Sequence, residues 1–213
     1  MKQKFVILGI GILLGLTACK SPHPSYTVEG DLQGLVNPSL LVLTPASFYT
    51  RIDTVIATKG KFSFTAESDS LQALVIFVEE ENIWFTVWAA NGDHVSIEGA
   101  VQSPEMLKIR GNAVNDSLTD FRQTNHKLID DLRAAVADTV TAQNYKQQLT
   151  ERIVQFIKNN PSSMASLVLM QDYLTAQEDI PLLQQQLQII EDPAKASALY
   201  EQLQTYSRTV SPP

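Results

Sequence analysis

From residue 26 to residue 110, apolar residues come in short runs that are separated by turn-forming residues. Phe62-Ser63-Phe64 and Val95-Ser96-Ile97 alternate strictly, as strands with one buried face do. Eight β-rich runs of this kind predict an antiparallel β module that resembles a sandwich. Gly60 and Gly92 lie between runs, and we expect hairpin turns there because glycine readily adopts a positive φ.

Beyond residue 111 the pattern takes a helical period. The first helix should carry an apolar face that contains one polar residue; the members of this face are Val114, Leu118, Phe121, Asn125, Leu128 and Leu132. Asn125 then needs a hydrogen-bond partner, either on the sheet or another helix of the same chain, or in a second copy. Four further helices are predicted around residues 145–156, 163–174, 183–190 and 193–206. Strands precede helices, so the predicted fold class is α+β.

The segment from Ile83 to Trp88 is apolar on both faces. Trp84, Thr86 and Trp88 point to one side of the predicted strand, and the alternate residues point to the other. Both faces should therefore be covered. Helices, a second chain or protein partner, and a bound ligand such as a sugar could each cover the tryptophan side. Trp84, Thr86 and Trp88 are the candidate binding residues.

The first 19 residues have the pattern of a bacterial lipoprotein signal. An apolar run from Phe5 to Leu16 follows a basic start, and it is too short to span a bilayer as a helix. Leu16-Thr17-Ala18-Cys19 resembles the lipobox of bacterial lipoproteins. The cysteine of a lipobox carries acyl chains, and palmitate is one of them. We expect a membrane anchor at Cys19 and a place in the cell envelope. No aspartate follows Cys19, which favours the outer membrane, on its periplasmic or surface face.

The expected organisation has five segments. They are a signal peptide at 1–18, a tether at 19–25, the β module at 26–110, a helical region at 111–208 and a tail at 209–213. Cys19 is the single cysteine, so an acylated chain has no thiol for a disulfide or for redox chemistry. The formal charge of −7 would become −9 with the loss of Lys2 and Lys4. An acidic chain argues against nucleic acid as a partner.

The sequence contains no recognisable catalytic or metal-binding arrangement. His23, His94 and His126 lack the spacing of metal ligands on one element. The acidic runs Glu79-Glu80-Glu81 and Asp130-Asp131 should point into water. We therefore expect no enzyme activity, no cofactor and no metal.

Four short motifs resemble an uncharacterised envelope module, the domain of unknown function 4369. They are Tyr26-Thr27-Val28-Glu29-Gly30, residues 52–64 with their Gly-Lys-Phe-Ser-Phe ending, residues 109–115, and residues 156–163. The resemblance implies that the module usually precedes the thioredoxin-like domain of thiol-disulfide interchange lipoproteins. No Cys-x-x-Cys occurs here, so that activity does not carry over. What the resemblance implies is the fold, the envelope location and an accessory role in binding or scaffolding.

Two functions are thus expected from the sequence. The first is a non-catalytic, lipid-anchored accessory module of the envelope. The second is a carbohydrate- or peptide-binding lipoprotein that uses the Trp84 and Trp88 face.

Replacing Cys19 with alanine tests the anchor. Cys19→Ala should move the protein out of the membrane fraction, or leave it unprocessed, because the acyl chains lose their attachment point. Fractionation and intact-mass spectrometry check this, and the neighbouring Lys20→Ala variant should stay acylated and membrane-bound. A mature wild-type protein with an unmodified Cys19 would contradict the prediction.

Overall fold

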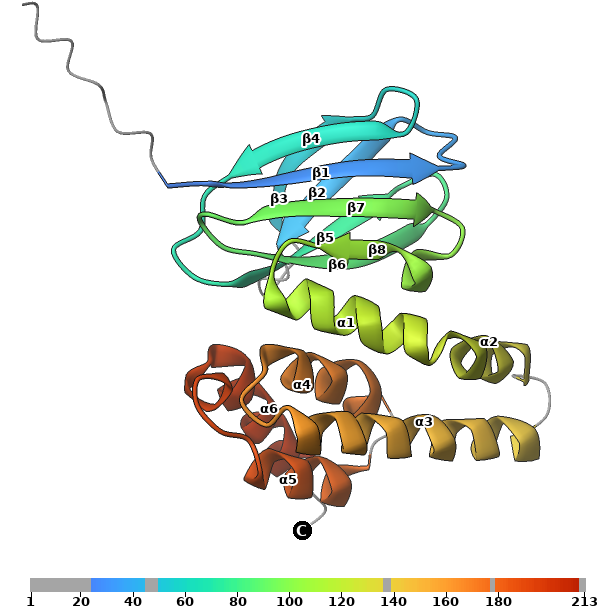
Figure 1. Cartoon of the computed structure of the whole chain (residues 1–213), viewed down its shortest axis with the longest axis vertical. Coiled ribbons are helices and arrows are strands. Elements are labelled where there is room, and N and C mark those ends of the chain that lie inside the picture. The colour runs from blue at the N-terminus through green and yellow to red at the C-terminus, as the bar shows by residue number, and fades with distance from the viewer. Residues whose placement is uncertain (1–23, 45–49, 136–138, 177–178, 211–213) are drawn as a thin grey trace, which may run out of the picture.

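In the residues that the structure describes, eight strands form two four-stranded sheets (Figure 1). The computed structural model describes residues 24–44, 50–135, 139–176 and 179–210, so Cys19 and the signal peptide lie outside the described part. In chain order the strands are β1 (Tyr26–Gln33), β2 (Ser39–Thr44), β3 (Thr50–Ile56), β4 (Lys61–Ala66), β5 (Gln72–Val78), β6 (Ile83–Ala89), β7 (His94–Ala100) and β8 (Lys108–Arg110).

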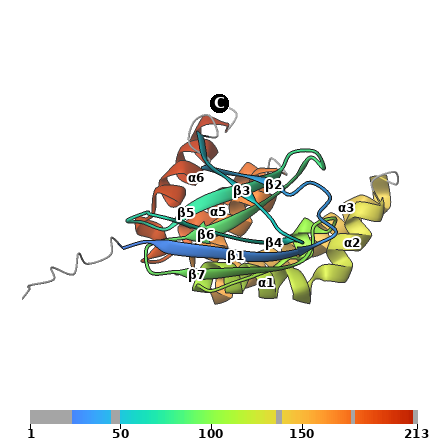
Figure 2. The same ribbon diagram turned by 90° about the horizontal axis from the view of Figure 1, so that it is seen from above.

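Sheet A has the strand order β4-β1-β7-β8, and sheet B has the order β3-β2-β5-β6. Neighbouring strands run antiparallel, except that β1 and β7 pair in parallel. Figure 2 shows the sheets as two layers, with β1 and β7 in one and β2 and β3 in the other. The prediction of an antiparallel β module is confirmed, except for the parallel β1–β7 pair, which it did not include.

The turns at Gly60 and Gly92 have the expected backbone but not the expected connections. Their φ angles are 81° and 94°. Both turns cross from one sheet to the other, from β3 to β4 and from β6 to β7, so the prediction of hairpins is wrong. A Cβ atom on Gly60 would lie 2.3 Å from the carbonyl oxygen of Leu32, so this crossover requires glycine.

The inner faces of the two sheets share one apolar core. Alternate residues of each strand point into it, and the exposed and buried residues of β4 follow this period. The largest fully buried side chains of the core are Tyr26, Leu32, Leu40, Leu74, Ile76, Ile97 and Leu107.

Helices follow the strands in the second half of the chain, which confirms the α+β class. The α-helices of the described part are α1 (Ala113–Thr124), α2 (His126–Ala134), α3 (Thr139–Asn159), α4 (Met164–Leu169), α5 (Ile180–Gln188) and α6 (Ala198–Thr209). Two 3₁₀ turns and a π-helical segment accompany them: η1 (Pro104–Met106), η4 (Ala194–Ala196) and η3 (Met170–Thr175). These helices pack around a second apolar cluster, which Trp88 joins from the sheet side. No helix in the described part is long and apolar enough to cross a membrane.

The predicted helix from Val114 to Leu132 is interrupted at Asn125, which separates α1 from α2. Asn125 is half-buried, and its side-chain amide donates to the Phe121 carbonyl at 2.8 Å. Its partner is thus within the chain, but it is the preceding turn of its own helix and not the sheet or another helix, as we had expected. This bond competes with the regular helical ladder, which explains why the apolar face does not continue as one straight helix.

Helix α1 lies along the open side of the strand module, next to the edge strands β6 and β8 (Figure 1). Buried Asn115 bonds both backbone groups of Trp88: its Oδ1 accepts from the N–H at 3.0 Å, and its Nδ2 donates to the C=O at 2.8 Å. One turn along, the Thr119 hydroxyl accepts from the Ile109 N–H at 3.1 Å and donates to the Ile109 C=O at 2.7 Å. Each side chain thus replaces a missing neighbouring strand, one for each sheet.

Thr119→Val tests this role with an almost unchanged side-chain volume. The variant leaves the buried Ile109 N–H and C=O without their partner, so the free energy of unfolding should fall by about 1–3 kcal/mol. Thr124→Val, at the exposed end of the same helix, is the matched control and should cost well under ~1 kcal/mol. Urea denaturation of both variants measures the difference, and equal losses would show that the Thr119 bonds do not stabilise the fold.

Candidate functional site

The three candidate residues of β6 share the outer face of sheet B, but the structure separates their surroundings. Trp84 is 59% exposed, Thr86 is half-buried, and Trp88 is only 7% exposed. Trp88 packs into the helical cluster, as expected of a side chain covered by helices. The two tryptophans therefore do not form one stacking surface, and only Trp84 presents its ring to solvent.

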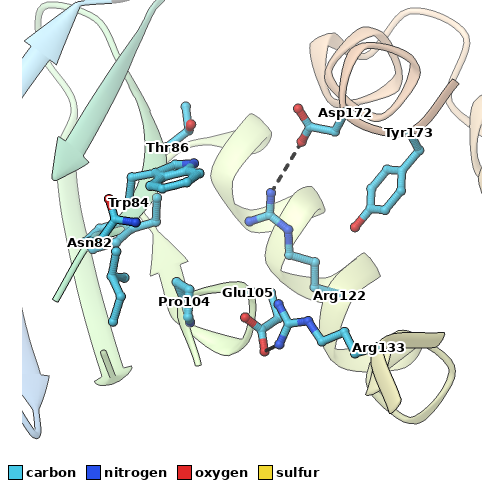
Figure 3. A pocket seen from close by; sticks show the side chains of 11 residues that line it. Asn82, Trp84, Thr86, Pro104, Glu105, Arg122, Arg133, Asp172 and Tyr173 are labelled. Atoms are coloured by element: carbon cyan, nitrogen blue, oxygen red, sulfur yellow. Dashed lines mark hydrogen bonds and ion pairs between the residues drawn. The ribbon is translucent and has the colours of Figure 1, made fainter. Parts of the chain in front are cut away.

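Trp84 and Thr86 line a cleft of about 480 Å³ between β6 and the helices, which we call the Trp84 cleft (Figure 3). Its strand wall is formed by residues 82–86. The facing wall comes from several helical elements and consists of Pro104, Glu105, Arg122, Arg133, Asp172 and Tyr173. This volume lies within the range of ligand-binding clefts.

The strand wall presents backbone groups as well as side chains. β6 is an edge strand of sheet B and pairs with β5 without a register shift from Ile83 to Ala89. The N–H and C=O of Trp88 point away from β5, since they bond to Asn115. Backbone direction alternates from one residue to the next, so the N–H and C=O of Thr86 and Trp84 also point away from β5. No group in the described part of the chain bonds to them there.

The facing wall is dominated by Arg122 of α1. Only 17% of this side chain is exposed, and Figure 3 shows the guanidinium pointing from α1 toward Trp84. Its nitrogen Nη2 lies 3.8 Å from the Asp172 carboxylate, which is an ion pair but is longer than a hydrogen bond. Arg122 therefore holds a mostly buried charge whose donors are not used up by this carboxylate.

The two carboxylates of the cleft, Asp172 and Glu105, lie in different environments. Partial burial raises the pKa of Asp172, although 42% of its side chain is exposed, and Arg122 opposes this rise. Burial also raises the pKa of the neighbouring Tyr173 hydroxyl. Glu105 forms an ion pair and hydrogen bond with Arg133, which raises the pKa of that arginine. Arg133 is thus paired with a carboxylate, whereas Arg122 lies 3.8 Å from Asp172 and interacts with the neutral Tyr173 hydroxyl, so it is only loosely paired with negative charge.

Comparison with protein families identifies the strand module. Residues 26–118 match the sequence model of a family described as a domain of unknown function. The match covers this stretch alone, and we call it the DUF4369 domain. The resemblance seen in the sequence motifs is therefore confirmed over these residues. No match was found among curated proteins.

The Trp84 cleft combines the DUF4369 domain with the helices that follow it. The strand wall, Pro104 and Glu105 belong to the domain, and so does Asn115. Arg122, Arg133, Asp172 and Tyr173 lie beyond residue 118. The DUF4369 domain thus supplies the aromatic ring and the free strand edge, and the helices supply the positive charges.

The lining of the cleft contains groups that can hold a ligand. An exposed indole ring can stack on a flat or apolar group, and a guanidinium can donate two parallel hydrogen bonds to a carboxylate or phosphate. The cleft contains no histidine, cysteine or serine among its lining residues. Within the described ranges, no three His, Cys, Asp or Glu side chains are grouped to hold a metal ion.

A second hollow, of about 690 Å³, lies among α1, α2 and α3, outside most of the DUF4369 domain. The rings of Phe121 and Phe156 meet edge to face there, with centroids 5.5 Å apart. Its exposed cations include Lys127, which bonds Asp131 on its own helix at 2.8 Å. This hollow offers neither an exposed tryptophan nor a free strand edge, so the Trp84 cleft is the stronger candidate.

The sequence pattern identified Trp84 and Thr86 but not the charged wall opposite them. Arg122 and Asp172 are fifty positions apart, and each sits among many other charged residues. One local feature of the sequence could have indicated Arg122. It directly follows Phe121 and lies near the apolar face of the predicted helix, where a charged residue is unusual.

Asp172→Asn tests whether the cleft holds this carboxylate at a cost. A raised pKa in the folded state means that Asp172 contributes most to stability when protonated, and that this contribution is lost as pH rises through the raised pKa. The free energy of unfolding of Asp172→Asn minus that of wild type should therefore be larger, and so more stabilising, at pH 7 than at pH 4.

Arg122→Gln provides the second arm of this test. Without the cation that opposes the rise, the pKa of Asp172 should be raised further, so the benefit of Asp172→Asn at pH 7 should be larger in the Arg122→Gln background. Denaturation curves at both pH values measure the four proteins. An Asp172→Asn variant that is destabilised at pH 7 and recovers at pH 4 would contradict the assignment.

Proposed function

We propose that the protein is a lipid-anchored protein of the cell envelope that works without catalysis, as an accessory module which binds a ligand in the Trp84 cleft. The observation that carries this proposal is the exposed ring of Trp84, which faces a mostly buried and loosely paired arginine. In the free protein, the exposed tryptophan ring contacts water and the arginine charge is partly desolvated, and both lower stability. A ligand that covers the ring and pairs with the charge removes these two costs.

The envelope part of the proposal rests on the lipobox at residues 16–19 and on the DUF4369 domain that begins at residue 26. Placement in the outer membrane, facing the periplasm or the surface, rests on the residues after Cys19. The accessory role follows from the implied relation to the N-terminal part of thiol-disulfide interchange lipoproteins, whose Cys-x-x-Cys is not in this sequence.

The proposed binding function concerns Trp84 alone of the two tryptophans. Trp84 is part of an apolar row across the outer face of sheet B. It lies beside Phe77 on β5, and Phe77 lies beside Leu41 on β2. A ligand that stacks on Trp84 can therefore also touch this row. A carbohydrate and a peptide both fit the aromatic ring and the polar rim of Asn82 and Thr86.

Trp84→Ala and Ile56→Ala form a matched pair for testing the cleft. Both remove an exposed apolar side chain from sheet B, 59% and 63% exposed, but Ile56 lies on β3 at the opposite edge of the sheet from β6. Labelled full-length protein in detergent is applied to arrays of glycans and peptides. Ligands bound by wild type should be bound by Ile56→Ala, and at least tenfold more weakly by Trp84→Ala, a loss of about 1.4 kcal/mol.

Circular dichroism of the same samples shows whether both variants are folded. Equal binding by Trp84→Ala and wild type would place the ligand elsewhere and reject the Trp84 cleft. A complete lack of ligands on both arrays would reject the binding function itself.

A further inference from the structure

We propose that the open part of the β6 edge binds an extended peptide segment as an added strand, and that Arg122 holds a carboxylate of that segment. This inference rests on the proposed function, because it names the ligand class for the same cleft. It selects the peptide over the carbohydrate, and it uses the backbone of β6 in addition to the ring of Trp84.

The first argument is the direction of the unpaired backbone groups. The N–H and C=O of Trp84 and Thr86 point into the cleft, and the described residues leave them without a partner on that side. These two positions are about 7 Å apart along the strand, which is the repeat of a neighbouring strand. A peptide in an extended conformation offers a matching N–H and C=O at this repeat, and a sugar does not.

The second argument is that the chain already fills the next position in this way. At Trp88 the side-chain amide of Asn115 supplies one donor and one acceptor, at 2.8 and 3.0 Å, as a peptide group of an adjacent strand would. The edge therefore accepts amide partners in this geometry. Asn115 satisfies one position of the edge and leaves the two positions that line the cleft.

The third argument is the charge on the opposite wall. Arg122 is 17% exposed, lies 3.8 Å from Asp172 and also interacts with the Tyr173 hydroxyl. A guanidinium has five N–H donors, so these two partners leave donors for a ligand. Arg133 is bonded to Glu105 and is less available. A carboxylate matches the geometry of a guanidinium better than any neutral peptide group does. Figure 3 shows Trp84 and Arg122 on opposite sides of the cleft, so a segment between them meets both.

The length of the segment is set by the ends of the cleft. Asn115 closes the edge at Trp88, and the turn at residues 79–82 ends the strand on the other side. The part of β6 that lines the cleft, residues 83–86, spans about 10 Å, so a peptide of roughly five residues covers it. The carboxylate can be the C-terminus of the peptide or an acidic side chain, and the chemistry at Arg122 is the same.

The test uses a defined probe, the acetylated peptide Thr-Val-Thr-Val-Glu with a free C-terminus, and the full chain in detergent micelles. Amide hydrogen exchange is followed by NMR. Binding should slow the exchange of the Trp84 and Thr86 amides by about tenfold or more, because a strand bonds to them. The amides of Phe85 and Val87, which face β5, should change little.

Changes in the probe identify the contacts without altering the protein. N-methylation of the peptide nitrogens that face β6 should abolish binding, and N-methylation of the alternate nitrogens should not. Replacing Glu by Gln and amidating the C-terminus, separately and together, shows which carboxylate Arg122 holds. Removing the correct one should weaken binding about tenfold in wild type and not in Arg122→Gln.

Thr86→Pro and Thr86→Val form the matched pair in the protein. Proline removes the Thr86 N–H, which faces the cleft and not β5, so an edge strand can tolerate it. Thr86→Val changes the side chain but keeps the N–H, so Thr86→Pro should weaken binding of the peptide at least tenfold more than Thr86→Val does. The emission of Trp84, the exposed one of the two tryptophans, reports binding in every sample.

The outcomes separate this inference from the proposed function. Binding of the peptide without protection of the Trp84 and Thr86 amides, or equal binding of both N-methylated probes, overturns strand addition and leaves the Trp84 cleft as a ligand site. No response to the peptide, with glycans bound on the array through Trp84, overturns the peptide class alone. Loss of both responses overturns the proposed function as well.

Discussion

The arrangement of the molecule depends on two side chains of α1 that take the place of strands. Asn115 bonds the edge of sheet B at Trp88, and Thr119 bonds the edge of sheet A at Ile109. Without these two side chains, buried N–H and C=O groups at both sheet edges would lack hydrogen-bond partners, and each such group would lower the free energy of unfolding. Because one helix satisfies both edges, it fixes the spacing of the two sheets on their open side and sets its own position against them.

That position determines where the charged wall of the cleft lies. Arg122 is one turn beyond Thr119 on α1, so the bonds that place the helix also place the guanidinium opposite Trp84. The cleft is therefore a joint product of the two halves of the chain. The DUF4369 domain, matched at 26–118, contributes Asn115 and the strand edge, and the following helices contribute Asp172 and Tyr173.

Local pattern predicted the elements well and their partners poorly. The alternation around Phe62 and Phe64 marks a buried face, and both side chains are buried in the core. The same alternation carries no information on which strand lies alongside, so the crossover at Gly60 and the parallel β1–β7 pair could not be read from it.

The candidate site shows the same limit. Two tryptophans four residues apart on one strand predicted an apolar outer face, and Trp84 and Trp88 lie on that face. Whether each ring is covered depends on helices more than twenty residues away, which bury Trp88 and leave Trp84 open. Asn115 was not recognised because a polar residue near the start of a helix usually caps that helix or faces water. Its bonds to Trp88 need the folded chain to become visible.

The shortness of the free β6 edge has a consequence for self-association. An exposed strand edge is a template on which identical chains can stack, and long, flat edges lead toward fibrils. Here α1 obstructs the edge at Trp88, the turn at 79–82 ends it, and the helices shield the gap between. Two backbone positions are too few to start a growing sheet. The helical layer therefore limits strand-to-strand aggregation, and it allows the protein to keep a short strand edge open.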